Sequence, residues 1–184
     1  MTPRSIFSFG RQGVILMALS FLAGCAGSSS RAPINTVDYV DLQRFMGDWY
    51  VIANIPTFVE KGAHNAVESY RLDDDGSIDT TFTFRADSFD GEQKTYNPRG
   101  FVVDTESNAV WGMQFVWPFK GDYRIVYLDD DYTRTAIGRE KRDYVWIMAR
   151  SPSIPDDEYA AIVSYLGDQG YDTSKIQKVP QRWE

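Results

Sequence analysis

The stretch Met46-Gly47-Asp48-Trp49-Tyr50 decides the fold, and it continues directly into the apolar run Val51-Ile52-Ala53-Asn54-Ile55. A glycine two residues before a tryptophan predicts a tight turn that leads into a first strand, because glycine adopts backbone angles that other residues resist. The tryptophan is large enough to close one end of a small core. Leu42, Phe45 and Met46 precede the turn at helical spacing, which predicts a short turn of helix before the strand.

Short apolar stretches separated by turn signals follow this first strand and predict an antiparallel all-β domain. The expected strands cover residues 65–72, 77–85, 95–104, 109–116, 122–128, 133–139 and 143–150, and a short final strand covers residues 175–179. Residues 155–170 predict one clear helix, with proline and acids in its first turn and a glycine at its end. Its apolar stripe, which we expect to pack on the sheet, consists of Tyr159, Ile162, Val163 and Leu166.

Three short motifs of this chain resemble those of the lipocalin family. Gly47 and Trp49 match its first motif, Asp131-Tyr132 matches part of its second, and Arg150 matches its third. The resemblance covers residues 36–184 and is closest to the bacterial outer-membrane lipoprotein branch. It implies an eight-stranded antiparallel up-and-down β-barrel over residues 37–184, with one C-terminal α-helix on the wall. It also implies that the arginine packs across the tryptophan at the closed end of the barrel.

Residues 1–24 have the features of an export signal, with Arg4 and Arg11 ahead of a short apolar stretch. The stretch ends in Leu22-Ala23-Gly24-Cys25, which resembles the lipobox of bacterial lipoproteins, so the resemblance implies palmitate-type acylation of Cys25. Residues 25–36 are small and polar and predict a flexible tether. The resemblance implies attachment to the outer membrane, with the domain in the periplasm. The alternatives are an ordinary signal peptide with an incidental cysteine, or an anchor that is not removed.

Composition excludes several classes of function. The net charge of −7 becomes −9 once the two arginines of the signal are removed, and an acidic protein lacks the basic surface that nucleic acids require. A single cysteine excludes an intramolecular disulfide, and a single histidine, His64, leaves little for a transition-metal site. The acids at 73–75 lack the later glutamate of a calcium loop. We therefore predict no metal, no cofactor and no nucleic-acid partner.

The resemblance also assigns the residues that face the barrel interior, taking Trp49 as inward and alternating along each strand. The expected ligand-binding residues are Glu68, Tyr70, Phe82, Met113, Phe115, Tyr127, Tyr144 and Trp146. Small residues on other inward positions predict some empty volume, namely Ala53, Ala66, Gly100, Ala136 and Gly138. The alternative is that large side chains fill the barrel.

Glu68 is the one carboxylate among the expected lining residues. A buried carboxylate must be paired or protonated, because an isolated buried charge is costly. On one interpretation, Glu68 accepts a hydrogen bond from a ligand hydroxyl or ammonium. On the other, it pairs with Arg71, Arg99 or Arg124. An error of one residue in the strand register would place it on the surface instead.

An apolar, aromatic lining with a few polar groups indicates a site for an elongated amphiphile. We therefore predict a non-enzymatic protein that binds a fatty acid, a lysophospholipid or a similar amphiphile. The resemblance implies lipid storage or transport in envelope maintenance. Two alternatives remain, an envelope interaction protein with a filled barrel and a lipid-modifying enzyme. The sequence leaves open whether the protein is a monomer or a dimer.

Overall fold

A one-turn helix leads through a glycine into the first strand in the computed structural model, which describes residues 31–183. Helix α1 (Leu42–Phe45) follows Asp41, whose side chain accepts a hydrogen bond from the backbone N–H of Arg44 at 3.2 Å. Strand β1 (Gly47–Ile55) starts at Gly47, whose φ of +95° lies in the left-handed region that favours glycine. The predicted turn, helical segment and first strand are therefore confirmed.

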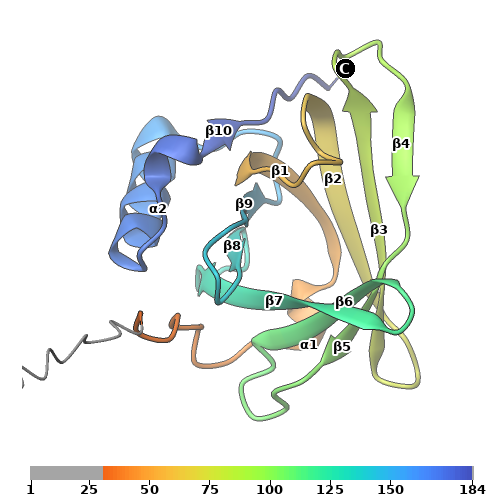
Figure 1. Cartoon of the computed structure of the whole chain (residues 1–184), viewed down its shortest axis with the longest axis vertical. Helices are drawn as coiled ribbons and strands as arrows, with labels where there is room; N and C mark the ends of the chain where they lie inside the picture. The colour runs from red at the N-terminus through yellow and green to blue at the C-terminus, as the bar shows by residue number, and fades with distance from the viewer. Residues whose placement is uncertain (1–30, 184) are drawn as a thin grey trace, which may run out of the picture. The chain divides into compact units, whose positions relative to one another are not determined.

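Antiparallel strands follow β1 around a sheet that closes on itself, because β9 pairs with β1 (Figure 1). They are β2 (Ala63–Leu72), β3 (Ser77–Ala86), β4 (Gln93–Tyr96), β5 (Arg99–Val102), β6 (Val110–Val116), β7 (Phe119–Leu128), β8 (Arg134–Gly138) and β9 (Val145–Ala149). Both β4 and β5 pair with β3, so together they occupy one position in the barrel. The predicted eight-stranded barrel is confirmed, with its fourth strand interrupted at Asn97-Pro98, where the proline lacks a donor for the ladder.

Two hydrophobic cores lie on opposite sides of the barrel wall. The inner core lies inside the barrel and includes Trp49, Ile78, Phe82, Trp111 and Ile125. The outer core lies between the wall and helix α2 (Asp156–Asp168), whose Ile162 and Leu166 are buried as the apolar stripe predicts. After α2 come the 3-10 turn η1 (Thr173–Lys175) and strand β10 (Gln177–Lys178), which adds to β1 and confirms the expected final strand.

Arg150 closes the end of the barrel at which α1 lies. Its guanidinium lies 3.8 Å from the centre of the Trp49 ring, and Trp49 Nε1 donates to the carbonyl of Phe45 at 2.9 Å. The guanidinium also donates to the carbonyls of Asp48 (2.7 Å), Met46 (2.8 Å), Phe45 (2.9 Å), Arg44 (3.0 Å) and Tyr132 (3.4 Å). The carbonyls at the end of this one-turn helix and in the turn after it thus receive hydrogen bonds from one side chain.

Two bulges change which side chains face the interior. In β1, Val51 pairs with Met148 and Ala53 pairs with Ile147, so one extra residue stands between them. In β7, Ile125 and Tyr127 pair with neighbouring residues of β8 in the same manner. Each extra residue reverses the alternation of the strand that follows it. Ile52 and Ala53 therefore join the outer core although Val51 belongs to the inner one.

Packing of the domain starts before the predicted boundary at residue 37. Ile34 is buried in the outer core, and its backbone N–H lies 3.3 Å from Glu140 Oε1. Asn35 N–H donates to Gln169 Oε1 at 3.1 Å. These contacts hold the last part of the expected tether against the domain. The expected signal, residues 1–24, and Cys25 lie outside the described residues. Among residues 31–183, no helix has the length and hydropathy needed to cross a membrane.

We predict that Arg150→Lys lowers the free energy of unfolding by about 1–3 kcal/mol, because lysine retains the charge but cannot reach the same set of carbonyls with a planar fork. Urea unfolding of the chain from Cys25 onward measures the change. Arg71→Lys is the matched control, since Arg71 is exposed and forms ion pairs only with Asp73 and Asp79. Equal effects of the two substitutions would contradict the structural role of Arg150.

Candidate ligand-binding site

The inside of the barrel is lined by aromatic rings that stack on one another. Trp111 and Tyr123 stack with ring centres 5.7 Å apart, and Tyr123 stacks on Trp146 at 6.3 Å. On the wall formed by β3 and β4, Phe84 and Tyr96 stack at 6.2 Å. These residues come from five different strands, and closure of the sheet brings them together.

Glu68 lies among these rings and is 7% exposed. The hydroxyl groups of Tyr70 and Tyr123 both donate to its Oε2, the second at 2.9 Å, and the two phenol oxygens contact each other. The predicted inward position of Glu68 is therefore confirmed, and of the two interpretations of its role, the pairing with an arginine is wrong. Arg71, Arg99 and Arg124 instead form ion pairs with acids outside the barrel interior, at Asp73, Asp79, Asp75, Asp122 and Glu140.

A second buried carboxylate, that of Glu60, is absent from the lining residues that the sequence predicts. Glu60 lies in the connection between β1 and β2 and is 6% exposed. It accepts hydrogen bonds from Thr57 Oγ1 (2.7 Å), Trp146 Nε1 (2.7 Å) and Asn54 Nδ2 (3.2 Å). A loop residue has no periodicity from which burial follows, so the sequence carries no signal for this position.

Both carboxylates have raised pKa values because burial penalises their charged forms. Burial raises the pKa of Glu68 to about 7, against the lowering effect of the two tyrosine hydrogen bonds, and the negative charge of Glu60 adds to the increase. Burial and the nearby Glu68 also raise the pKa values of Tyr70 and Tyr123 well above their ordinary range, so both phenols stay protonated and donate. The side chains that donate to the two carboxylates are all neutral.

The expected lining residues divide into those inside the barrel and those elsewhere. Tyr70 is 3% exposed, and Phe82 and Met113 are each 4% exposed in the inner core, against which Trp146 also packs. Tyr144 precedes β9 and packs against the outer core, not the inner one, with its ring 6.4 Å from that of Trp146 and beneath the guanidinium of Arg139.

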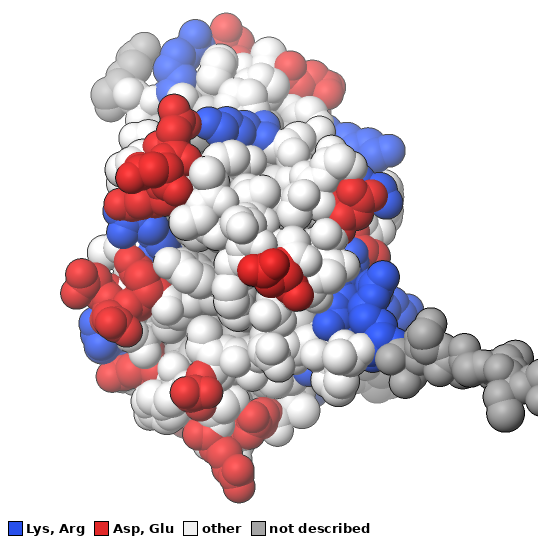
Figure 2. Space-filling model, turned by 90° about the vertical axis from the view of Figure 1, so that its left-hand side faces the viewer, with Lys and Arg blue, Asp and Glu red and all other residues white. Residues whose placement is uncertain are grey.

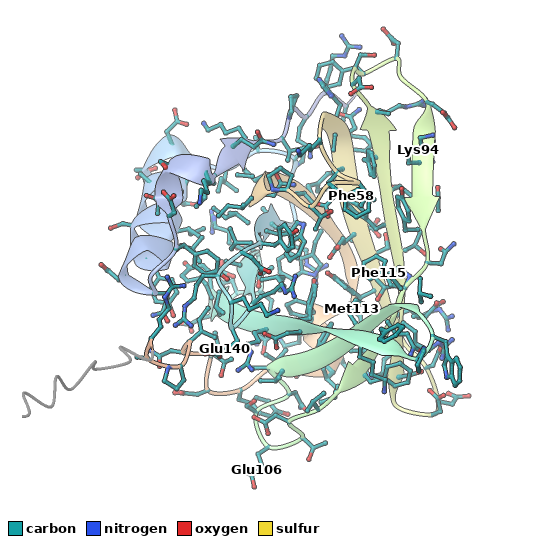
Figure 3. The ribbon with its side chains drawn as sticks, viewed as in Figure 1. Phe58, Lys94, Glu106, Met113, Phe115 and Glu140 are labelled. Carbon is teal, nitrogen blue, oxygen red and sulfur yellow. The ribbon has the colours of Figure 1, made fainter. Side chains whose placement is uncertain are left out.

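Two further expected lining positions are wrong. Tyr127 packs against Tyr165 of α2 in the outer core, with ring centres 5.7 Å apart, because the bulge in β7 reverses the alternation before it. Phe115 is 61% exposed, because the pairing of β6 and β7 shifts register after Met113. Figure 3 labels both Phe115 and Met113 near the end of β6.

Three of the small residues expected to leave space inside the barrel face outward. Ala53 and Ala136 belong to the outer core. A Cβ on Gly138 would lie 2.6 Å from the hydroxyl of Tyr171, so this glycine permits close packing outside the wall. Ala66 and Gly100 remain on the inner side, where Ala66 is buried in the inner core and a Cβ on Gly100 would meet Met113.

In the region of the second family motif, Asp131-Tyr132, the structural contacts are made by Tyr132 and by the nearby Asp129. The hydroxyl of Tyr132 accepts from the backbone N–H of Asp41 at 2.8 Å, and Arg44 stacks 4.0 Å from its ring centre. Asp131 is exposed. Asp129 organises the turn instead, since it accepts from the backbone N–H groups of residues 133 and 134. Burial raises the pKa of Asp129, but these hydrogen bonds outweigh it and leave the pKa lowered.

The connection between β6 and β7 exposes large aromatic residues. Trp117 and Phe119 are 80% and 75% exposed, and Phe58 in the β1–β2 connection is 83% exposed. By the alternation of strand direction, both connections lie at the end of the barrel opposite the acidic turn at residues 73–75. Figure 2 shows a different face, on which acidic side chains are spread among uncharged ones.

A family model described as a lipocalin-like domain matches residues 40–181. The chain therefore belongs to the lipocalin family. It is 28% identical over 174 residues to the outer membrane lipoprotein Blc of Escherichia coli K12, which covers 89% of this chain and 92% of that protein. It is 29% identical over 168 residues to the temperature-induced lipocalin-1 of Arabidopsis thaliana, which covers 83% of this chain and 86% of that protein.

Solved structures show the same fold at lower identity. The cockroach allergen Per a 4 is 19% identical, with a TM-score of 0.62 over 80% of this chain and 92% of that chain. Insecticyanin from the tobacco hornworm Manduca sexta is 15% identical, with a TM-score of 0.64 over 82% of this chain and 85% of that chain. These similarities support the barrel fold and nothing more specific.

We predict that Glu68→Gln makes the free energy of unfolding less dependent on pH. Glu68 has a folded-state pKa of about 7, above its ordinary value of 4.5, so its contribution to stability is complete below pH 4.5 and is lost as the pH rises to about 7. This shift corresponds to about 3 kcal/mol. The free energy of unfolding of the variant, relative to that of the wild type, should therefore be about 3 kcal/mol higher at about pH 8 than at about pH 4.

Urea unfolding at both pH values measures this gain. Glu106→Gln is the control, because Glu106 is exposed in the turn between β5 and β6 and is labelled there in Figure 3. A gain for Glu68→Gln no larger than that for the control would show that the carboxylate is not held in its neutral form.

Proposed function

We propose that this chain binds a single-chain amphiphile, such as a fatty acid or a lysophospholipid, inside its barrel without catalysing a reaction. The observation that carries the proposal is the small polar cluster of Glu68, Tyr70 and Tyr123 within an otherwise aromatic interior. Burying a carboxylate costs free energy that an apolar residue would avoid. An apolar lining with a few convergent polar groups is the usual composition of a small-molecule site.

We further propose that the protein is a lipoprotein of the bacterial outer membrane, anchored through an acyl group on Cys25 with the barrel in the periplasm. Two observations support this. The lipobox-like residues end at the only cysteine of the chain. Relatives named outer membrane lipoprotein Blc from Escherichia coli and Vibrio cholerae align over 89% and 91% of this chain. Lipid storage or transport in envelope maintenance is the role that this location suits.

One specific observation favours a second candidate function, an envelope interaction protein with a filled barrel. Interior side chains pack closely on each other, since Phe45 lies 5.1 Å from Trp49 and 5.6 Å from Tyr70 between ring centres. Two of the alanines expected inside face α2 instead. In this case the aromatic residues serve as a core, and the barrel takes up no ligand.

We predict that Ala66→Trp lowers the affinity for an apolar probe at least about tenfold, because the added ring occupies volume inside the barrel, and a tenfold change corresponds to about 1.4 kcal/mol. Fluorescence of N-phenylnaphthylamine, titrated into the chain from Cys25 onward, measures the affinity. Ala160→Trp adds the same ring to the exposed face of α2 and should leave binding unchanged.

Ala66→Leu is the milder variant if the tryptophan prevents folding, and circular dichroism reports the fold of each protein. Absence of probe binding to the wild type, together with no lipid in its native mass spectrum, would favour the filled barrel.

We predict that Cys25→Ser abolishes incorporation of radiolabelled palmitate and releases the protein from the outer-membrane fraction. Several acyl chains, at about 0.8 kcal/mol per buried methylene, hold a protein on a membrane far more strongly than a surface contact does. Ser28→Ala, in the same segment, is the control and should retain both properties. Palmitate labelling of Cys25→Ser at the wild-type level would refute the assigned attachment site.

A further inference from the structure

Asn54 places a hydrogen-bond acceptor without a partner inside the wall of the barrel. Its side chain is 2% exposed, and its Nδ2 donates to Glu60 Oε2 at 3.2 Å. Its Oδ1 is buried and has no hydrogen-bond partner among the described residues. The carboxylate requires the nitrogen on its side, because the opposite orientation would bring two acceptors together. A buried amide oxygen without a donor costs free energy, so this atom indicates a donor from outside the chain.

The acid beside Asn54 is also suited to a donor. Glu60 Oε1 accepts only from Thr57, which leaves acceptor capacity on that oxygen, and its three hydrogen-bond donors are neutral. Glu60 and Asn54 belong to different segments, the β1–β2 connection and the end of β1. Trp146 joins them from β9, because it pairs with Asn54 in the sheet and donates its Nε1–H to Glu60.

Aromatic faces and a second carboxylate lie next to this pair. The ring centre of Trp146 is 6.3 Å from that of Tyr123 and 6.4 Å from that of Tyr144. Tyr123 in turn donates to Glu68 at 2.9 Å. The faces of such rings carry negative electrostatic potential and attract cations. The region therefore combines electron-rich rings, two carboxylates and an amide oxygen that lacks a donor.

We propose that Asn54, Glu60 and Trp146 form a head-group site that selects amphiphiles with a primary ammonium group over those with a carboxylate. An ammonium group supplies three donors and a positive charge, which match Asn54 Oδ1, Glu60 Oε1 and the neighbouring rings. A carboxylate or phosphate head would meet acceptors of its own kind there. This inference rests on the proposed binding of an amphiphile in the barrel and specifies the head group that it carries.

The test compares three ligands that share one alkyl chain and differ only in the head, namely dodecylammonium, dodecanol and dodecanoate. Each displaces N-phenylnaphthylamine from the chain that begins at Cys25, which contains both hydrophobic cores. The titrations are made at about pH 8 and below the critical micelle concentration of each ligand. We expect dodecylammonium to bind at least about tenfold more tightly than dodecanol, and dodecanoate to bind most weakly, since a desolvated cation–ring or cation–carboxylate contact is worth about 1.4 kcal/mol or more.

Substitution of the acid separates charge recognition from simple burial of the chain. Glu60→Gln should reduce the preference for dodecylammonium over dodecanol to less than about threefold. Glu106→Gln removes the same charge from an exposed turn and should retain the full preference. Asn54→Leu retains the carboxylate but removes the free acceptor, and it should also weaken dodecylammonium selectively. If Glu60→Gln does not fold, the same loss of preference in Asn54→Leu supports the site.

The outcomes distinguish this inference from the proposed function. Equal affinities for the three ligands, or tightest binding of dodecanoate, would overturn the head-group site and leave amphiphile binding intact. An unchanged preference in both Glu60→Gln and Asn54→Leu would overturn it as well. No displacement by any ligand, with no binding of the probe itself, would instead overturn the proposed function.

Discussion

The contact between Arg150 and the chain that crosses one end of the barrel is the interaction on which the rest of the fold depends. A closed sheet leaves two open ends, and a core inside it excludes water only if one end is covered. Here α1 covers that end, but a single turn of helix cannot satisfy its own carbonyls. Arg150 satisfies them from the end of β9 while its guanidinium lies against Trp49. One planar side chain thereby joins the first strand, the last barrel strand and the turn that contains Tyr132.

Two bulges then distribute one set of apolar residues between two cores. Without them, strict alternation along β1 and β7 would send Ala53 and Tyr127 into the barrel. The bulges turn both residues outward, where Tyr127 meets Tyr165 of α2. The same change places Asn54 beside Trp146 and Glu60. The helix therefore gains a complementary surface and the interior gains a polar side chain through the same backbone irregularity.

The interior of this barrel is acidic and aromatic at once, a combination that a purely structural core does not need. The side chains that donate hydrogen bonds to Glu60 and Glu68 are all neutral, so neither of these hydrogen-bond clusters contains a cation. Burial moves the pKa values of both carboxylates upward, and the charge of Glu60 adds to the increase at Glu68. Under the proposed function, these polar groups distinguish ligands by what their heads donate, while the rings supply the apolar contact for the chain.

The sequence by itself determined the first turn, the antiparallel strands and the helix, because these follow from local features: the glycine before Trp49, the alternation along the strands, and the spacing of Ile162 and Leu166. Closure of the strands into a barrel, and the end covered by Arg150, were implied by the resemblance of its motifs to those of the lipocalins. The sequence also identified Glu68 as an inward carboxylate, while its tyrosine partners are known from the structure alone. Only the tertiary structure decided that Tyr127 faces α2, that Glu60 is buried and that Asn54 Oδ1 lacks a donor. Periodicity predicts which side of the sheet a side chain lies on only while the strand register is regular. A bulge or a loop breaks that register, and the partners that cause it lie far away in the chain.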